Sequence, residues 1–327
     1  MREADILERI GKELGQVHKL LHGRRLLLQM GDDAALLAPE PGCETLLTCD
    51  WFLEGTHFLR NKHRPDSVGW KCLARAVSDI AAMGGSPLCF LLSLALPESC
   101  NSRWLGQFLT GLRRGARHFG VELAGGDTTR SRRILISITV VGEVLRGQAL
   151  RRSGARPGDF IYVSGRLGEA RLGFELLRKG SCRIPGASAA LRKHLYPVPR
   201  IELGRQLAEQ HLVTAMIDVS DGLSTDLYHI CQASGTGARV DARKIPLPRL
   251  PSSRSLQFNP LQLALHGGDD YELLFTVPRR LARELLDAYQ DLLLTKIGEV
   301  TRSKEILLED GNRLRSLIPG GWDPFVR

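Results

Sequence analysis

Aspartates that lie in short clusters with glycine or hydroxyl residues are the part of this 327-residue chain most suited to chemistry. Carboxylate oxygens are ligands that Mg²⁺ prefers, and a glycine beside them lets backbone N–H groups approach a phosphate closely. The pattern therefore predicts phosphoryl transfer that depends on positioning and charge neutralisation. The five clusters are Gly31-Asp32-Asp33, Thr48-Cys49-Asp50, Gly125-Gly126-Asp127-Thr128, Asp218-Val219-Ser220-Asp221-Gly222 and Gly267-Gly268-Asp269-Asp270.

A sixth candidate, Asp79, lies inside a helical pattern over 66–83. On a helical wheel it flanks an apolar stripe, so we expect it to face the body of its domain rather than open solvent. Each aspartate cluster taken alone also fits an ordinary turn, because Gly-Asp pairs are common turn formers. The combination of five clusters with a helix-borne aspartate favours the metal-dependent site.

Motifs of several other catalytic classes are absent from the sequence. It contains no G-x-x-x-x-G-K-[ST] phosphate loop and no G-x-G-x-x-G dinucleotide fingerprint with an acidic partner. The H-R-D and D-F-G motifs of protein kinases and the G-x-S-x-G motif of hydrolases are also missing. The stretch 218–222 lacks the spacing and terminal Glu of an EF-hand calcium loop.

Alternating strand-like and helical patterns must position these clusters, which predicts an α/β or α+β class. The stretch 151–158 is polar and turn-rich, and it separates an expected domain 1–150 from an expected domain 151–327. The expected strands are 45–50, 88–96, 134–141, 160–164, 213–219, 238–241, 271–277 and 292–300, and the expected helices are 3–14, 66–83, 103–119, 169–179, 200–210, 221–233 and 280–289.

Net charge and cysteine usage limit the partners and the compartment. The formal charge of +9 fits nucleic acid, an anionic membrane surface or small anionic substrates, and an aromatic content of 6% argues against a base-stacking surface. The seven cysteines are scattered without C-x-x-C spacing, which is typical of reduced thiols rather than of disulfides or a zinc site. No apolar run reaches the roughly 20 residues of a membrane span. We therefore expect a cytoplasmic protein.

Seven motifs in order resemble those of the thiamine-monophosphate kinase family. That family is part of the superfamily of aminoimidazole ribonucleotide synthetase, the selenophosphate synthetases and a hydrogenase maturation protein. The resemblance runs from about residue 3 to Phe325, and the combination of EGTHF, DVSDGL and GG-acidic-DYEL is specific to the kinase branch. The motifs are GDDAALL (31–37), DWFLEGTHF (50–58), SDIAAMGGSP (78–87), GGDTTRS (125–131), RSGARPGD (152–159), IDVSDGLSTDL (217–227) and GGDDYELLFTV (267–277).

The resemblance implies a two-domain PurM-like fold of α/β and α+β class. Its N-terminal mixed-sheet domain would bind ATP and Mg²⁺ and pair into a dimer barrel, and its C-terminal α+β domain would complete the active site. The implied reaction is ATP-dependent phosphorylation of thiamine monophosphate to thiamine diphosphate, by direct in-line transfer with several Mg²⁺ ions and no phosphoenzyme. The implied partners are these two small molecules and a second copy of the chain, with no nucleic acid and no membrane.

The resemblance also assigns site residues, and none of them acts as a covalent nucleophile. Two positions depart from the family pattern: Cys49 stands where Thr or Ser is common, and Asp269 stands where Glu is usual. The implied metal ligands are Asp33, Thr48, Asp50, Asp79, Asp127, Asp218 and Asp221; the implied ATP contacts are Gly126, Asp127, Arg152 and Ser220; and the implied substrate contacts are His57, Asp269 and Trp322.

Three alternatives remain open on the sequence. Another ATP-dependent enzyme of the superfamily is one; however, a selenophosphate synthetase is expected to carry a reactive cysteine in a glycine-rich N-terminal segment, and the first cysteine here is Cys43. A hydrogenase maturation protein is expected to end in cysteine, whereas this sequence ends Pro-Phe-Val-Arg. A catalytically inactive nucleotide-binding homologue is the second alternative. The third is a nucleic-acid-binding protein, favoured only by the positive charge.

Overall fold

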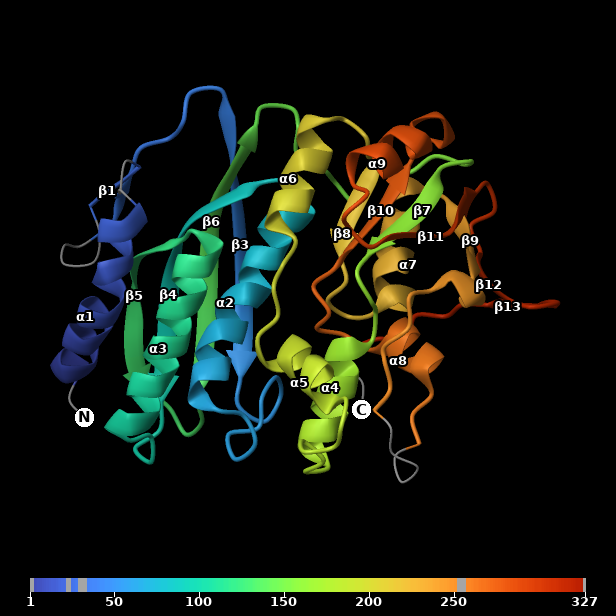
Figure 1. The fold of residues 1–327 in the computed structure, drawn as a ribbon. Helices are drawn as coiled ribbons and strands as arrows, with labels where there is room; N and C mark the ends of the chain where they lie inside the picture. Colours follow the sequence, from blue (N-terminus) through green and yellow to red (C-terminus); the bar gives the residue numbers. More distant parts are fainter. Residues whose placement is uncertain (1–2, 22–24, 29–33, 252–256, 326–327) are drawn as a thin grey trace. The chain divides into compact units, whose positions relative to one another are not determined.

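The computed structural model describes residues 3–21, 25–28, 34–251 and 257–325. It divides the chain into two compact units. The first unit comprises Met1–Ala81 with Gly85–Gly147, and the second comprises Ala82–Gly84 with Gln148–Arg327. Each unit has its own β-sheets, and Figure 1 shows their strands and helices in sequence colours.

The first unit is built on a four-stranded mixed sheet in the order β3-β6-β4-β5. The central strand β6 pairs antiparallel with β3 and with β4, and β5 lies parallel to β4. A separate antiparallel pair is formed by β1 and β2. The strands are β1 (Leu26–Leu28), β2 (Leu36–Leu37), β3 (Cys43–Leu53), β4 (Ser86–Leu96), β5 (Glu122–Arg130) and β6 (Leu135–Leu145).

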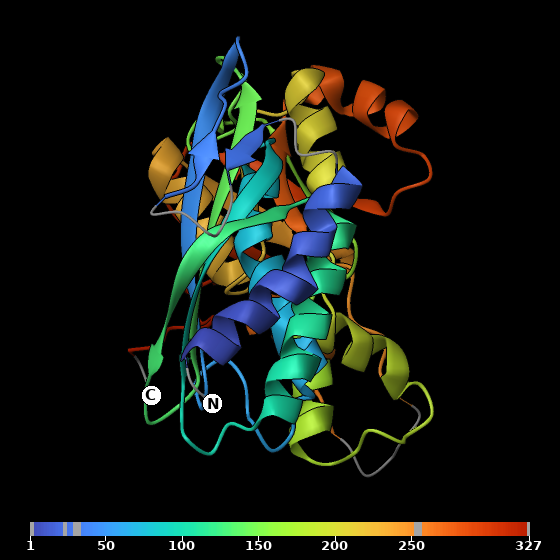
Figure 2. The same cartoon turned by 90° about the vertical axis from the view of Figure 1, so that its left-hand side faces the viewer.

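Three helices of the first unit lie on one side of this sheet, as Figure 2 shows: α1 (Glu3–Leu21), α2 (Pro65–Ala82) and α3 (Ser102–Phe119). The expected stripe on α2 is buried, with Leu73, Val77 and Ile80 at most 2% exposed. Helix α3 begins where the Asn101 side chain accepts a hydrogen bond from the Trp104 N–H, and it ends at Gly120 in the left-handed conformation. These helices and the sheet enclose the core of the unit.

The second unit contains a seven-stranded sheet in the order β13-β12-β9-β11-β7-β10-β8. Its neighbours pair antiparallel, apart from the parallel pair of β12 and β9. The strands are β7 (Phe160–Ser164), β8 (Ala215–Asp218), β9 (Gly237–Asp241), β10 (Leu273–Val277), β11 (Leu294–Thr301), β12 (Ile306–Asp310) and β13 (Arg313–Ser316).

Both faces of this sheet are buried around β7, β8 and β10. On one face Ile161 and Ile217 pack with Leu227 of α7, and on the other Tyr162 and Met216 join a cluster with residues of α6 and α9. The strands therefore consist of nearly continuous apolar runs that end at the polar clusters. The helices are α4 (Glu169–Arg178), α5 (Ala187–Leu195), α6 (Ile201–Glu209), α7 (Leu223–Ser234), α8 (Pro260–His266) and α9 (Ala282–Ala288).

The predicted two-domain α/β and α+β architecture is confirmed. The strand expected at 160–164 has those bounds, and the other expected strands and helices are present with shifted ends. The sequence did not predict β1, β2, β5, β12, β13, α5 or α8. The expected division of binding roles between 1–150 and 151–327 stays a prediction. No helix within the described ranges is both long and apolar enough to cross a membrane.

Candidate active site

In the first unit, the structure brings together three of the predicted metal ligands between β3 and α2. The Thr48 hydroxyl donates a hydrogen bond to a carboxylate oxygen of Asp79, and Arg75 Nε lies 3.1 Å from Asp50 Oδ1. Thr48 and Asp50 are two residues apart on a strand, so both point to the face that α2 covers. Asp79 and Arg75 are one helical turn apart and face that strand. The result is a half-buried group of oxygen donors with one cation beside it.

Asp127 lies apart from that group. It pairs with Ser93 in the register of β5 with β4, on the sheet face where Leu91 is exposed. Asp50, by contrast, pairs with the buried Ile138 on the face covered by helices. From the sequence, the five aspartate clusters are expected at the ends of apolar strands, and this is wrong for Asp127 and Asp50, which lie within β5 and β3.

Gly126 has no room for a side chain. A Cβ placed on it would lie 1.9 Å from the carbonyl oxygen of Leu92, which belongs to the neighbouring strand. Its φ of 157° is near the extended range, so the requirement for glycine arises from the close backbone contact. The structure thus gives a steric reason for glycine here and leaves its predicted contact with ATP as a prediction.

His57 lies in the turn that follows β3. Its Nδ1 accepts a hydrogen bond from the Leu53 N–H at 3.0 Å, and its ring stacks on Phe52 with centroids 5.7 Å apart. A nitrogen that accepts carries no proton, so the neutral ring is protonated at Nε2. The turn therefore fixes the orientation and the tautomer of this predicted substrate contact.

Two further predicted residues, Asp32 and Asp33, lie outside the described residues.

In the second unit, the predicted residues from three distant segments are joined by backbone hydrogen bonds. The Asp269 N–H donates to the Ser220 carbonyl at 2.8 Å, and the Trp322 N–H donates to the Asp221 carbonyl at 2.9 Å. Asp218 ends β8 and is 3% exposed. The structure thus places these five residues in one constellation at the end of β8.

The loop that carries Ser220 and Asp221 is held from within by Asp226 of α7. The Asp226 carboxylate accepts hydrogen bonds from the backbone N–H groups of Gly222 at 3.0 Å and Asp221 at 3.3 Å. Burial raises the pKa of Asp226 well above its ordinary value, and the charges of Asp218 and Asp221 raise it further. The motifs do not predict this role for Asp226, although an aspartate five residues after Asp221 and inside a helical pattern is a usable signal.

Arg152 lies in the exposed loop before β7, and its carbonyl accepts a hydrogen bond from the Ser234 hydroxyl at 3.3 Å. Burial lowers the pKa of His229 on α7, the charge of Arg152 lowers it further, and the charge of Asp221 raises it. The His229 imidazole is therefore close enough to Arg152 and to Asp221 for both charges to shift its pKa. His229 is not predictable from the sequence, because a histidine on a helix carries no signal without its neighbours in space.

The oxygen-rich composition of both groups fits Mg²⁺. Asp218 and Asp221 lie close enough to Asp226 for their charges to shift its titration, so a cation would relieve repulsion among these carboxylates. Within the described residues, no three His, Cys, Asp or Glu side chains form a group that could hold a metal ion alone. Mg²⁺ is commonly held by one or two carboxylates together with waters and substrate phosphates.

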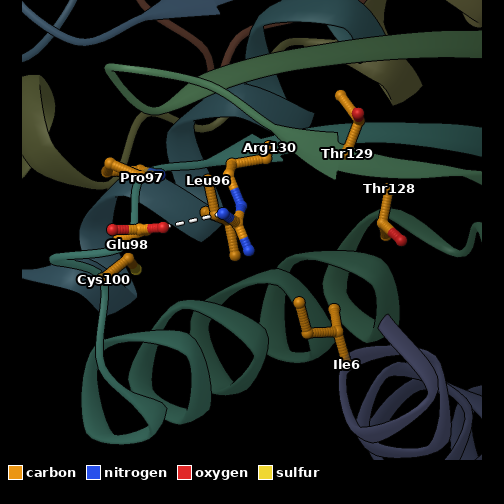
Figure 3. Close-up of a pocket in the computed structure, with 8 residues that line it drawn as sticks. All are labelled: Ile6, Leu96, Pro97, Glu98, Cys100, Thr128, Thr129 and Arg130. Carbon is orange, nitrogen blue, oxygen red and sulfur yellow. Dashed lines mark hydrogen bonds and ion pairs between the residues drawn. The ribbon is translucent and has the colours of Figure 1, made fainter. Parts of the chain in front are cut away.

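A pocket of about 470 Å³ lies elsewhere in the first unit, where β4 and β5 end (Figure 3). Its rim carries an exposed ion pair between Arg130 and Glu98, with the two charged groups 2.7 Å apart. It includes none of the predicted site residues, although Thr128 and Thr129 directly follow Asp127. The lining residues are Ile6, Leu96, Pro97, Glu98, Cys100, Thr128, Thr129 and Arg130.

Models of the two domains of one group of proteins match the sequence over most of its length. Residues 31–144 match the N-terminal domain of AIR synthase related proteins, and residues 156–310 match the C-terminal domain of the same proteins. The two matches fall on the two structural units described above.

Relatives with a named activity are similar over nearly the whole chain. The thiamine-monophosphate kinase of Aquifex aeolicus is 36% identical over 96% of this chain and 99% of its own length. The crystal structure of thiamine-monophosphate kinase from Stenotrophomonas maltophilia is 38% identical, covers 90% of this chain and 95% of its own, and superposes with a TM-score of 0.80. A structure described as AaThiL complexed with AMPPCP and TMP is 33% identical, covers 93% and 94%, and gives a TM-score of 0.74.

Proposed function

The chain belongs to the thiamine-monophosphate kinase family, and on that premise we propose that it transfers the γ-phosphoryl group of ATP to thiamine monophosphate. The observation that carries the proposal is the constellation in the second unit, where residues from three distant segments meet through two backbone hydrogen bonds. A related structure described with AMPPCP, an ATP analogue, and TMP supports the choice of both substrates.

The proposed step is a direct in-line displacement. An oxygen of the thiamine monophosphate phosphate forms a bond to the γ-phosphorus of ATP, and the bond from that phosphorus to the bridging oxygen breaks. The products are thiamine diphosphate and ADP. No side chain has to act as a strong base, because the attacking phosphate oxygen already carries negative charge. The protein therefore contributes mainly by positioning and by charge.

Carboxylates in both units are proposed to hold magnesium. In the first unit these are Asp50 and Asp79 with the hydroxyl of Thr48, and in the second they are Asp218 and Asp221. Asp33 and Asp127 stay proposed ligands on the resemblance alone. Bound magnesium supplies positive charge that offsets the charge of the transferring phosphates.

Other residues are proposed to orient the two substrates. The exposed guanidinium of Arg152 can donate two hydrogen bonds to one phosphate, which a lysine cannot do in a fixed geometry. Gly126 and Ser220 offer backbone contacts to ATP. For thiamine monophosphate, Trp322 offers an aromatic face to a cationic ring, and His57 and Asp269 offer polar contacts.

The direct test is to incubate the purified protein with ATP, Mg²⁺ and thiamine monophosphate and to follow thiamine diphosphate. Asp221→Ala is expected to lower kcat at least about 100-fold, because it removes charge stabilisation from the transferring group. Asp310→Ala provides a matched control, since this aspartate is exposed at the end of β12. Circular dichroism should show both variants folded.

Two outcomes would count against the proposal. Folded wild-type protein that forms no thiamine diphosphate would exclude the kinase activity. Full activity of Asp221→Ala would exclude the metal-binding role of this residue while leaving the activity itself in place.

We further propose that the protein works as a homodimer in the cytoplasm, where ATP is supplied. The dimer proposal is supported by the sheet face of the first unit that lies opposite α2. Four large apolar residues are exposed there: Leu47 at 72%, Trp51 at 55%, Leu91 at 39% and Leu145 at 46%. Several exposed large apolar residues on one sheet face are typical of an interface between proteins.

A further inference from the structure

The segment that carries Trp322 is fixed by three consecutive backbone N–H groups to the first turn of α7 and to the residue before its N-cap. Gly320 donates to the Ser224 hydroxyl at 3.2 Å, Gly321 donates to the Thr225 hydroxyl at 3.1 Å, and Trp322 donates to the Asp221 carbonyl at 2.9 Å. Upstream, the Leu317 N–H donates to the Ile306 carbonyl at 2.8 Å. The segment 317–322 is thus held at both of its ends.

The two glycines before Trp322 allow this close contact. A Cβ on Gly321 would lie 2.1 Å from the Asp221 carbonyl oxygen, and one on Gly320 would lie 2.8 Å from Nδ1 of His266. A side chain on Gly321 would overlap the backbone, so that position accepts no larger residue unless the segment moves, and one on Gly320 would displace either the segment or the His266 ring. The sequence Gly-Gly-Trp therefore encodes a backbone that lies directly against the start of α7 and the end of α8.

The hydroxyl groups that receive the segment have no role in capping α7. Hydroxyl residues at a helix start commonly cap free N–H groups. Here the helix begins after Gly222, which has no side-chain cap, and the carboxylate of Asp226 binds the N–H groups of Asp221 and Gly222 instead. Ser224 and Thr225 thereby remain available to accept hydrogen bonds from the segment.

The Ser224 hydroxyl is also hydrogen-bonded to a half-buried histidine at the end of α8. Ser224 is fully buried, and its oxygen lies 2.9 Å from Nδ1 of His266. The same hydroxyl oxygen accepts the Gly320 N–H, so Ser224 links the segment to both α7 and α8.

We propose that Ser224 and Thr225 are positioning residues that hold Trp322 in place to receive the thiamine ring of the substrate. This inference rests on the proposed kinase function. The side chain of Trp322 is 41% exposed although its backbone is fixed, so its ring presents surface to a ligand at a set place. A tryptophan that is already positioned costs less conformational entropy when the ligand binds.

The test compares Thr225→Val, which removes the hydroxyl and keeps the shape, with Thr225→Ser, which keeps the hydroxyl. We expect Thr225→Val to raise the KM for thiamine monophosphate about five- to tenfold, the size of one lost hydrogen bond. The KM for ATP and the Mg²⁺ dependence should stay unchanged, and Thr225→Ser should restore the wild-type KM. In a Trp322→Ala background, Thr225→Val should raise the KM for thiamine monophosphate little further, because both changes act through the tryptophan ring.

A second measurement does not depend on activity. Hydrogen exchange at the backbone amides of Gly320 to Trp322 should be faster in Thr225→Val than in the wild type, because the segment loses one of its contacts. If exchange is unchanged, the hydroxyl does not hold the segment and the inference fails.

The kinetic outcomes separate this inference from the proposed function. A wild-type protein without turnover would overturn the kinase activity itself. Turnover with an unchanged KM in Thr225→Val would overturn only the positioning role. An equal rise in the KM for ATP, or a changed Mg²⁺ dependence, would show that Thr225 acts through Asp221 and would likewise overturn the positioning role.

Discussion

Asp269 and Tyr271 adopt left-handed backbone conformations, with φ of 69° and 49°. Such conformations cost about 1–3 kcal/mol each outside glycine, and they concentrate at functional sites where the surrounding structure enforces them. Here the Tyr271 hydroxyl donates to Asp269 Oδ1 at 2.8 Å, while the Tyr271 N–H donates to the Val219 carbonyl at 2.9 Å. The strained backbone thus turns the carboxylate of Asp269 toward a fixed partner.

Removing this hydroxyl by Tyr271→Phe should impair substrate binding selectively. The lost hydrogen bond to a charged group is expected to raise the KM for thiamine monophosphate about tenfold, with little change in the KM for ATP. Tyr289→Phe is the matched control, since the Tyr289 hydroxyl donates to Gln210 at 3.1 Å, between α9 and the end of α6. Steady-state kinetics with each substrate varied in turn would measure both. An equal rise in both KM values in Tyr271→Phe would contradict the role assigned to Asp269.

At the residue scale, motifs identified the residues that bear the proposed chemistry and left out those that orient them. The resemblance pointed to Asp221 and Asp269 because they lie inside recognisable strings. Asp226 and Tyr271 lie in the same strings, but their roles depend on which backbone groups approach them in space. No sequence motif points to His229, because its relation to the site is its proximity in space to the charges of Arg152 and Asp221. The residue-by-residue roles remain predictions until they are measured.

At the scale of elements, the buried carboxylate of Glu272 joins the start of β10 to α5 and to the segment before α6. Lys193 lies 2.5 Å from it, Arg200 donates two hydrogen bonds at 2.6 and 2.8 Å, and the Ser164 hydroxyl donates at 2.6 Å. Burial alone would raise the pKa of Glu272, but Lys193 and Arg200 outweigh burial and hold that pKa below its ordinary value. This carboxylate is therefore fully partnered.

Glu272→Gln should be strongly destabilising. It leaves Lys193 and Arg200 without their counter-charge, and breaking a buried pair costs about 3–5 kcal/mol. Glu299→Gln is the control, because Glu299 forms an exposed ion pair with Arg279 at 3.1 Å, and such pairs contribute at most about 1 kcal/mol. Urea unfolding at pH 7 would compare the two free energies of unfolding. A loss below about 1 kcal/mol in Glu272→Gln would show that the network does not hold these elements together.

The neighbouring Asp270 should make stability depend on pH in the opposite direction to Glu272. Its carboxylate accepts hydrogen bonds from the Ala170 N–H at 3.0 Å and from the Gly168 N–H at 2.5 Å, at the start of α4. Burial raises its pKa to about 7, although Lys193 and these two N–H groups lower it. A carboxyl with a raised pKa stabilises the fold fully below its unfolded pKa, and this contribution is lost as the pH rises through about 7.

Asp270→Asn should therefore reduce the slope of the free energy of unfolding against pH between about pH 4 and pH 7. The slope should change by up to about 1.4 kcal/mol per pH unit. The variant also loses one acceptor at the start of α4, so the slope and not the absolute stability is the measure. Glu272 has a lowered pKa, so its contribution to the free energy of unfolding is present above pH 4.5 and is lost as the pH falls below that value. This pH range lies below most of the range in which Asp270 acts. Chemical denaturation at several pH values gives the slope. A slope unchanged by Asp270→Asn would contradict the raised pKa.

The elements themselves were largely predictable, and the exceptions have physical reasons. Strand β5 includes Gly-Gly-Asp-Thr-Thr, a composition typical of a turn, and it extends only because β4 pairs with it. Helices α5 and α8 are nine and seven residues long, too short for a clear apolar period. The strands β12 and β13 are four or five residues long and depend on pairing with β9 and with each other.

At the scale of the whole molecule, the exposed apolar residues on the sheet face of the first unit opposite α2 predict self-association. Leu47→Glu places a charge at the most exposed of its apolar positions and should shift a dimer to monomers, because an unpaired charge at an apolar interface is costly. Ile318→Glu, at an equally exposed apolar position of the second unit, is the control and should leave the association unchanged. Light scattering coupled to size-exclusion chromatography would measure the mass. A monomeric wild-type protein would exclude the proposed dimer.

The central place of β6 also determines when the first unit can fold. Its partners on either side are β3 and β4, and the pairing of Cys43 with Leu145 joins residues about one hundred positions apart. During synthesis β3 and β4 therefore emerge without the strand that must insert between them, and the sheet closes only after residue 145 has left the ribosome. Contacts of such sequence separation form slowly, because a long loop must first be closed. The growing chain consequently exposes unpaired, apolar strand edges for the time needed to synthesise that stretch, and this is the interval in which chaperones would be needed most.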